Sequence, residues 1–260
     1  MGFETIITQQ AGPSFIVTLN RPHRRNAVDL MMMEEIIAAA RQAEAEPTVR
    51  ALIITGGKDY FSAGADLNDA LAIKTPAAGA DYFGRWHRLN ATLEKLGKPV
   101  IAAIEGFCMT GGCEMALACD IRVAGKGASF AITSSRIGTV PGAGGTQRLP
   151  RIVGIGKALE LMFSAETIDA AEAYRVGLVN RLVPAGRALE EACTMAAVYE
   201  KRAPLSHALI KRAVRQGMQM DLDSGVEFET LAVTTIYGTE DKDEGISAFL
   251  EKREACFKGR

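Results

Sequence analysis

The stretch from residue 98 to residue 148 constrains this chain most, because it joins a buried strand, a glycine turn and a helix. The apolar run at 99–104, PVIAAI, has the length and composition of a buried strand. Gly111 carries no Cβ, so its amide can approach a ligand oxygen near the positive end of the following helix. Glu114 lies three residues later on the same helical face. The sequence therefore predicts an anion-stabilising corner with a carboxylate beside it.

The rest of the chain divides into a mixed body and a helical tail. Apolar runs between turn residues predict strands at 6–9, 15–19, 49–55, 119–124 and 178–183. Apolar residues at spacings of three and four predict helices at 29–44, capped by Asp29, and at 81–96, 205–218, 222–236 and 241–253. We expect a body over 1–190 and a helical region over 191–260 that packs on the core or on another subunit.

Composition and charge exclude several classes of protein. The formal net charge is -1 and 48% of the 260 residues are hydrophobic, which argues against a nucleic-acid binder. We find no run long enough to span a bilayer and no targeting sequence before the first strand, so we expect a cytoplasmic protein. The five cysteines lack zinc-ligand spacing, so we expect reduced thiols, most of them buried as small hydrophobes, and no metal.

Two loops rich in small residues are candidates for ligand binding. In the segment FSAGAD at 61–66, small side chains let backbone amides reach a ligand, although a tight loop with Asp66 capping a short helix explains it equally. The loop at 138–145 is glycine-rich, but it lacks the Lys-Ser/Thr pair of a P-loop and is not G-x-G-x-x-G. We therefore do not expect it to bind a nucleotide.

Five segments in this order resemble the crotonase family, also called the enoyl-CoA hydratase/isomerase superfamily. They are LNRP at 19–22, FSAGADL at 61–67, GGCE at 111–114 with CDIR at 119–122, PGAGGTQRL at 141–149 and SAFLEKR at 247–253. The resemblance covers nearly the whole chain. It implies an α/β fold, a spiral of ββα units with a C-terminal α-helical trimerisation region, assembled as a homotrimer or a hexamer of two trimers. It also implies an acyl-CoA thioester substrate and no cofactor.

The same resemblance assigns roles to particular residues. The backbone N–H groups of Ala65 and Gly111 form an oxyanion hole, and Glu114 matches one of the two catalytic glutamates of the hydratases. The second glutamate is replaced by Ser134, because hydratases usually have Pro-Glu where this chain has Thr133-Ser134. The expected substrate-binding residues are Arg25, Ala63, Ala65, Asp66, Leu67, Asn68, Gly111, Pro141, Gly142 and Lys252, with Arg25 and Lys252 either near the nucleotide phosphates or simply solvated.

Ser134 leaves the reaction open among three outcomes. Hydration needs a base for water and an acid for the α-carbon, and a serine hydroxyl serves poorly as either near neutral pH. Glu114 performs both roles in turn, which gives an enoyl-CoA hydratase; or the chain is a one-glutamate isomerase, decarboxylase or carbon–carbon lyase; or it binds CoA esters without catalysis. No motif identifies the acyl group, and Tyr82 and Trp86 are read either as walls of its pocket or as core.

Overall fold

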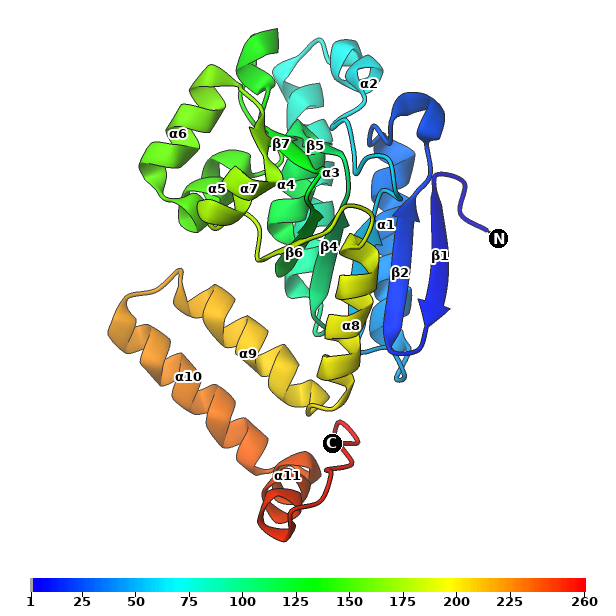
Figure 1. Ribbon diagram of the computed structural model, residues 1–260. Coiled ribbons are helices and arrows are strands. Elements are labelled where there is room, and N and C mark those ends of the chain that lie inside the picture. The colour runs from blue at the N-terminus through cyan, green and yellow to red at the C-terminus, as the bar shows by residue number, and fades with distance from the viewer. Residues whose placement is uncertain (1) are drawn as a thin grey trace.

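The computed structural model describes residues 2–260, which form an α/β body and a helical arm (Figure 1). A six-stranded sheet forms the centre of the body, and all its neighbouring strands are parallel except the first pair. In sheet order the strands are β1 (Ile6–Ala11), β2 (Ser14–Leu19), β3 (Ala51–Thr55), β4 (Val100–Ile104), β6 (Ile121–Gly125) and β9 (Arg181–Val183). The predicted strands are all present, with ends that differ by a few residues.

A second, three-stranded sheet contains β5 (Phe107–Met109), β7 (Ser129–Ala131) and β8 (Ile168–Asp169). The chain passes from β4 to β5 and helix α4 (Thr110–Ala118), and then from β6 to β7 and further helices. These two turns thus each contribute one strand to each sheet before a helix. This is the spiral of ββα units that the family resemblance implied.

The middle strands of the central sheet are buried on both faces. Leu52 and Ile54 of β3 face a core shared with α1 (Leu30–Ala45) and α3 (Pro76–Lys95). Ala51 and Ile53, the alternate residues, face α8 (Ala188–Glu200). Parallel strands covered on both faces are expected to be continuously apolar, which explains why the 49–55 segment shows no polar alternation.

Helix boundaries follow the local capping chemistry. The Asp29 carboxylate accepts a hydrogen bond from the Met32 amide at 2.8 Å and begins α1, as predicted. The Asp66 carboxylate caps α2 (Leu67–Ala72) by accepting from the Asn68 amide at 3.0 Å. Helix α3 begins five residues before the predicted residue 81, because Thr75 caps it and Pro76 occupies its first turn.

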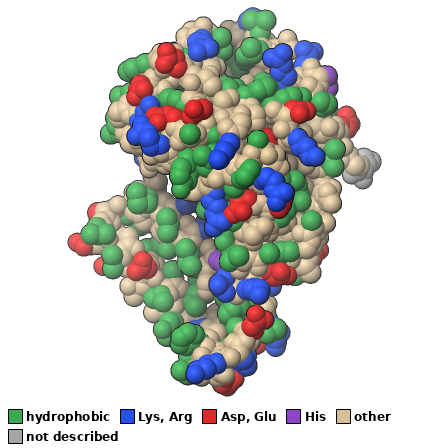
Figure 2. Space-filling model, viewed as in Figure 1, with side chains coloured by type: hydrophobic (Ala, Val, Ile, Leu, Met, Phe, Trp, Pro, Cys, Tyr) green, Lys and Arg blue, Asp and Glu red, His purple; other side chains and the backbone are tan. Residues whose placement is uncertain are grey.

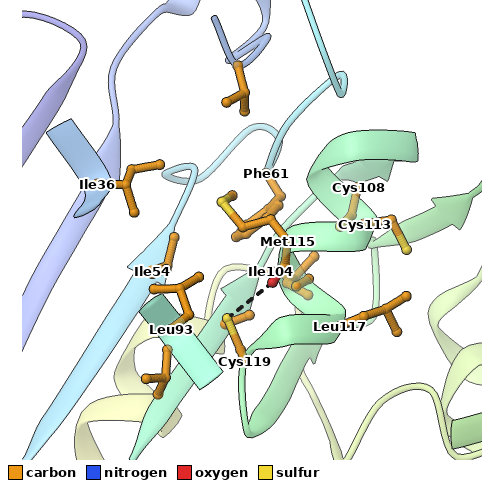
Figure 3. Packing of buried hydrophobic residues seen from close by; sticks show 14 of the residues in the cluster. Ile36, Ile54, Phe61, Leu93, Ile104, Cys108, Cys113, Met115, Leu117 and Cys119 are labelled. Carbon is orange, nitrogen blue, oxygen red and sulfur yellow. Dashed lines mark hydrogen bonds between the residues drawn. The ribbon is translucent and has the colours of Figure 1, made fainter. Parts of the chain in front are cut away.

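Helix α4 lies in the middle of the core (Figure 3). Every residue of α4 after Thr110 is buried, among side chains that include Phe61, Ile104 and Leu93. Cys108, Cys113 and Cys119 are buried free thiols around this helix, as expected of small hydrophobes. Burial raises the pKa of Cys119 to about 12, so this thiol stays protonated.

The remaining elements are short, apart from the helices at the C-terminal end. Two 3₁₀ turns and three helices complete the body: η1 (Pro22–Arg24), η2 (Ser134–Ile137), α5 (Gly145–Val153), α6 (Ile155–Ser164) and α7 (Ala170–Arg175). The chain ends in α9 (Pro204–Gly217), α10 (Leu222–Tyr237) and α11 (Glu240–Glu251).

These last three helices form an arm that extends away from the body (Figure 1). Helix α10 packs on α9, and α8 packs on the central sheet. The expected boundary at residue 190 therefore falls inside α8. Figure 2 shows hydrophobic side chains over the arm and a hollow between arm and body. No helix within residues 2–260 has the length and apolar character needed to cross a membrane.

Candidate active site

Two loops at the carboxyl ends of β3 and β5 lie against each other and form the floor of the site. The Met109 amide donates to the Ser62 carbonyl at 2.9 Å, and the Phe61 amide donates to the Phe107 carbonyl at 3.0 Å. The Ser62 hydroxyl donates to the Asn26 carbonyl at 2.7 Å and accepts from the Gly64 amide. These bonds fix the relative position of two segments that lie about 45 residues apart in the sequence.

The amides of Ala65 and Gly111 lie close together across this junction. A Cβ built on Gly111 would lie 3.1 Å from the Ala65 nitrogen, and a Cβ built on Gly64 would lie 3.4 Å from the Gly111 nitrogen. Neither amide donates a hydrogen bond within residues 2–260. Two unpaired N–H donors on fixed backbone suit an oxygen that gains negative charge.

The residue before Gly111 is held in an unusual conformation. Thr110 has φ of +39°, in the left-handed region that a β-branched residue rarely adopts. Its hydroxyl is 2.7 Å from the Thr133 hydroxyl and accepts from the Thr133 amide at 3.1 Å. Gly111 follows Thr110, and Ser134 follows Thr133. The bonds between the two threonines therefore bring Ser134, which stands where hydratases usually have a second glutamate, close to Gly111. Ser134 is buried at the start of η2.

Glu114 is buried, with 2% of its surface exposed. Its Oε1 accepts hydrogen bonds from the amides of Ala143, at 2.9 Å, and Gly145, at 2.7 Å. Among residues 2–260 no donor binds Oε2, which leaves this oxygen available to a water or a substrate proton. Burial raises the pKa of Glu114 to about 7, against the two amides and the charge of Arg148, which lower it. Such a carboxyl exchanges protons readily near neutral pH.

One face of α3 closes the site from the side. A Cβ on Gly111 would lie 2.9 Å from Cη2 of Trp86, so this ring packs directly on Gly111. Tyr82 and Asn90, one turn on either side of Trp86, are also buried. The Tyr82 hydroxyl and the Asn90 Oδ1 find no hydrogen-bond partner within residues 2–260. Trp86 therefore belongs to the core and also contacts Gly111, while its expected role as a wall of the acyl pocket stays a prediction.

The expected substrate-binding residues fall into two groups. Ala63, Ala65, Leu67 and Asn68 follow the loop from β3 into α2, and Pro141 and Gly142 lie on the loop beside Glu114, where Gly142 contacts Phe83. Lys252 lies at the end of α11, on the arm and away from the amide corner of its own chain (Figure 1).

Two of the side chains expected to bind substrate, Asp66 and Arg25, differ in their surroundings. The Asp66 carboxylate pairs with Arg21 at 3.1 Å, and its hydrogen bonds from Asn68 and Arg21 outweigh burial and lower its pKa. It therefore has a structural role here. Arg25 is exposed at the end of η1, and its carbonyl accepts from the Ala63 amide at 3.0 Å. No cluster of His, Cys, Asp or Glu suited to a metal ion occurs among residues 2–260.

The profile of the enoyl-CoA hydratase/isomerase family matches residues 13–260 of this chain. The chain belongs to the enoyl-CoA hydratase/isomerase family. It is 40% identical over 259 residues to a crotonyl-CoA hydratase of Syntrophomonas wolfei, a match that covers 99% of both chains. A short-chain-enoyl-CoA hydratase of Clostridium acetobutylicum is 38% identical over 262 residues, with both chains fully covered.

Solved structures of enoyl-CoA hydratases share the fold. The enzyme from Bacillus anthracis superposes with a TM-score of 0.94 at 36% identity, over 99% of this chain and all of that one. The enoyl-CoA hydratase/isomerase fold therefore extends over the arm as well as the body.

Three structural features of the candidate site were not predicted from sequence. They are the strained Thr110, the buried Asn90 and the contact of Arg148 with the loop that holds Glu114. A helical spacing of four from Trp86 to Asn90 gave a signal for the second. The other two depend on contacts between segments distant in sequence.

Proposed function

We propose that this protein adds water to a 2-enoyl-CoA thioester, with Glu114 as its single catalytic carboxylate. The observation that supports this most directly is the buried Glu114. Its Oε2 accepts from no donor among residues 2–260, and Glu114 lies one helical turn after Gly111, whose amide is close to that of Ala65. Curated hydratases match the chain over its full length, which supports the same reaction.

In the proposed reaction Glu114 handles one proton twice. Its ionised carboxylate takes a proton from water, and the hydroxide oxygen bonds to C3 of the acyl group. The electron pair of the double bond moves toward the thioester, whose oxygen becomes negative as an enolate forms. The amides of Ala65 and Gly111 donate to that oxygen, and each such donor contributes roughly 10²–10³ in rate. The enolate collapses as Glu114 returns the proton to C2, so one water is added overall.

Ser134 holds the reacting water in this scheme. A hydroxyl both donates and accepts, so it orients a water without taking its proton at neutral pH. The adjoining Thr110–Thr133 pair fixes the segment that carries Ser134. Of the two glutamates that hydratases usually have, only Glu114 is then present to act as a base.

A hydration assay tests this proposal. We expect purified protein to consume short- and medium-chain trans-2-enoyl-CoA esters, and Glu114→Gln to lose at least about 10²-fold in kcat because it has no ionisable oxygen. Glu229→Gln, on the exposed surface of α10, is the matched control and keeps full activity. Turnover by the wild type no faster than by Glu114→Gln rules out this role.

Ser134 favours a second candidate, a related one-glutamate isomerase, decarboxylase or carbon–carbon lyase. These reactions also pass through a thioester enolate but do not require two carboxylates. A panel of malonyl-type, β-keto and dienoyl thioesters, followed by mass spectrometry, separates the two. Reaction of the simple enoyl esters alone removes this candidate, and tight binding without any product identifies a CoA-ester binder.

The remaining site and assembly assignments are part of the same proposal. Ala63, Leu67 and Asn68 line the path of the CoA chain, Pro141 and Gly142 border the acyl group, and Arg25 lies near the phosphates. Because Lys252 lies at the far end of the arm, we propose that it reaches the site of a neighbouring copy in a homotrimer or hexamer. The free thiols support a reducing, cytoplasmic location.

A further inference from the structure

The loop that holds Glu114 is itself held from behind. Ala143, whose amide donates to Glu114, has a carbonyl that accepts from Arg148 Nη1 at 3.0 Å and from Asn90 Nδ2 at 2.7 Å. A Cβ on Gly144 would lie 1.8 Å from Arg148 Nη1, so glycine leaves the space that the guanidinium fills. The loop position therefore depends on Arg148, which plays no direct part in the proposed chemistry.

Arg148 is in turn fixed by Glu94. Its Nε and Nη2 donate to the two carboxylate oxygens of Glu94, both at 2.8 Å, which is the two-point geometry that orients a guanidinium. Both side chains are about four-fifths buried, with exposures of 19% and 23%. Glu94 belongs to α3 and Arg148 to α5. The pair therefore links two helices behind the loop.

A second arginine connects this pair to the arm. Arg215 of α9 donates from Nη1 to Glu94 at 2.9 Å, and from Nη2 to Asp120 at 2.9 Å and to the Ala118 carbonyl at 3.0 Å. Ala118 is the last residue of α4, the helix that carries Glu114. Arg215 thus contacts the helix that carries Glu114, and it is connected through Glu94 and then Arg148 to the loop that binds Glu114.

The charged groups around this connection come from every neighbouring element. They are Glu94 of α3, Asp120 after α4, Arg148 of α5, and Lys211 and Arg215 of α9. Of these, only Arg148 contacts the Glu114 loop directly, and its positive charge lowers the pKa of Glu114 against the effect of burial.

We propose that Arg148 is a positioning residue for Glu114, and that Glu94 and Arg215 make its position depend on the docking of the C-terminal arm. The arm then does more than assemble subunits, because its first helix supports the geometry of the catalytic carboxylate.

Charge variants test the first part, with the Glu114 titration as readout. The titration is followed by NMR of protein carrying ¹³C at the glutamate side-chain carboxyl, with the signal assigned by its loss in Glu114→Gln. We expect Arg148→Met to move the titration midpoint upward, because a positive charge is removed. We expect Glu94→Gln to move it downward, because the charge of Arg148 is no longer neutralised. A role in folding alone does not produce opposite shifts.

Kinetics separate position from charge. Arg148→Lys keeps the charge but loses the two-point hydrogen bond to Glu94. We therefore expect the midpoint of the Glu114 titration to stay near that of the wild type. We expect kcat to fall about tenfold and KM to change by less than about threefold. Midpoints that do not move, or that move in the same direction in Arg148→Met and Glu94→Gln, overturn the proposal. The kinetic readout rests on the proposed hydration, whereas the NMR readout does not, so absent hydration with opposite shifts counts against the function alone.

Arg215→Met tests the connection to the arm, with Arg212→Met as the matched control on the same helix. Arg212 lies over the Phe228 ring, at 5.7 Å from its centroid, and so faces α10. We expect Arg215→Met to raise the Glu114 midpoint and to lower kcat several-fold at unchanged oligomer mass, while Arg212→Met leaves both as in the wild type. Equal effects of the two variants overturn the role of the arm.

Discussion

At the scale of single residues, Glu114 combines deep burial with an ionisable group. Its carboxylate receives two backbone hydrogen bonds and, within residues 2–260, forms no ion pair at contact distance, so burial dominates and raises its pKa to about 7. An ionised carboxylate in such a place lowers stability, because the unfolded chain solvates it better. Burial of Glu114 therefore lowers the stability of the folded protein whenever this carboxyl is ionised.

The pH dependence of stability measures this cost. The pKa of Glu114 is higher in the folded protein than the usual 4.5. The protonated carboxyl therefore contributes fully to the free energy of unfolding at low pH, and this contribution is lost as pH rises through about 7. We expect Glu114→Gln to leave stability nearly unchanged at pH 5 and to increase it by roughly 1–3 kcal/mol at pH 8. Urea unfolding at one protein concentration checks this, with Glu229→Gln as the control. An equal effect at both pH values contradicts the prediction.

Ser134 offers the complementary test at this scale. We expect Ser134→Glu to increase the hydration rate by at least about tenfold, because a second carboxylate supplies the acid or base that the wild type lacks. Ser134→Ala removes only the hydroxyl and is expected to lower the rate by less than about tenfold. Enoyl-CoA turnover by the three proteins decides the matter, and a slower Ser134→Glu shows that the missing carboxylate does not limit the reaction.

At the scale of elements, the contact of α4 with the loop after β3 determines where the two amides point. Gly112 faces Ser62 so closely that a Cβ would lie 2.6 Å from the Ser62 Cβ and 2.8 Å from its hydroxyl. A side chain at this point therefore displaces one segment from the other. The glycines at 111 and 112 thus serve two purposes, access to the amide and close packing of the helix.

A methyl group at this contact tests its importance. We expect Gly112→Ala to lower kcat by about 10²-fold, because a shift of about 1 Å spoils the alignment of the amides, and to cost about 1–3 kcal/mol of stability. Gly84→Ala is the matched control, since its Cβ meets nothing within 4 Å on the exposed side of α3. It is expected to raise stability by about 0.5–1 kcal/mol and leave kcat unchanged.

At the scale of the whole molecule, the arm exposes an amount of apolar surface that is unusual for an isolated chain. Leu222, Leu231, Phe249 and Leu250 are 81%, 65%, 83% and 73% exposed. Apolar side chains gathered on one projecting unit mark a surface that another chain covers. These side chains belong to the helical region expected over residues 191–260, whose role in oligomerisation stays a prediction.

A single charge in this surface tests the assembly. We expect the wild type to have the mass of a trimer or hexamer of the 27.8 kDa chain, and Leu231→Glu to shift it toward the monomer, because a buried unpaired charge is costly. Glu227→Gln on the same helix keeps the wild-type mass. Analytical ultracentrifugation distinguishes these results, and a monomeric wild type contradicts the expectation.

Much of the fold and of the reacting groups was predictable from the chain alone. Apolar periodicity and capping residues such as Asp29 and Asp66 gave the order and type of most elements, because these signals act within a few residues. The glycine turn before Glu114 predicted the passage from a strand into a helix at this point for the same reason. Short strands such as β7 and the 3₁₀ turn at Ser134 were not predicted, since their backbone bonds come from other segments.

Local sequence thus determined the elements and the family, and it singled out the amides of Ala65 and Gly111 and the carboxylate of Glu114 as candidates. Only the tertiary structure decided how those groups behave. The pKa of Glu114 depends on how much of the protein surrounds it and on two amides about 30 residues away. The closeness of Ala65 to Gly111 depends on hydrogen bonds between separate loops. The position of Arg148 depends on contacts among α3, α5 and α9. Burial and long-range contacts arise from the path of the whole chain, and no window of sequence contains them.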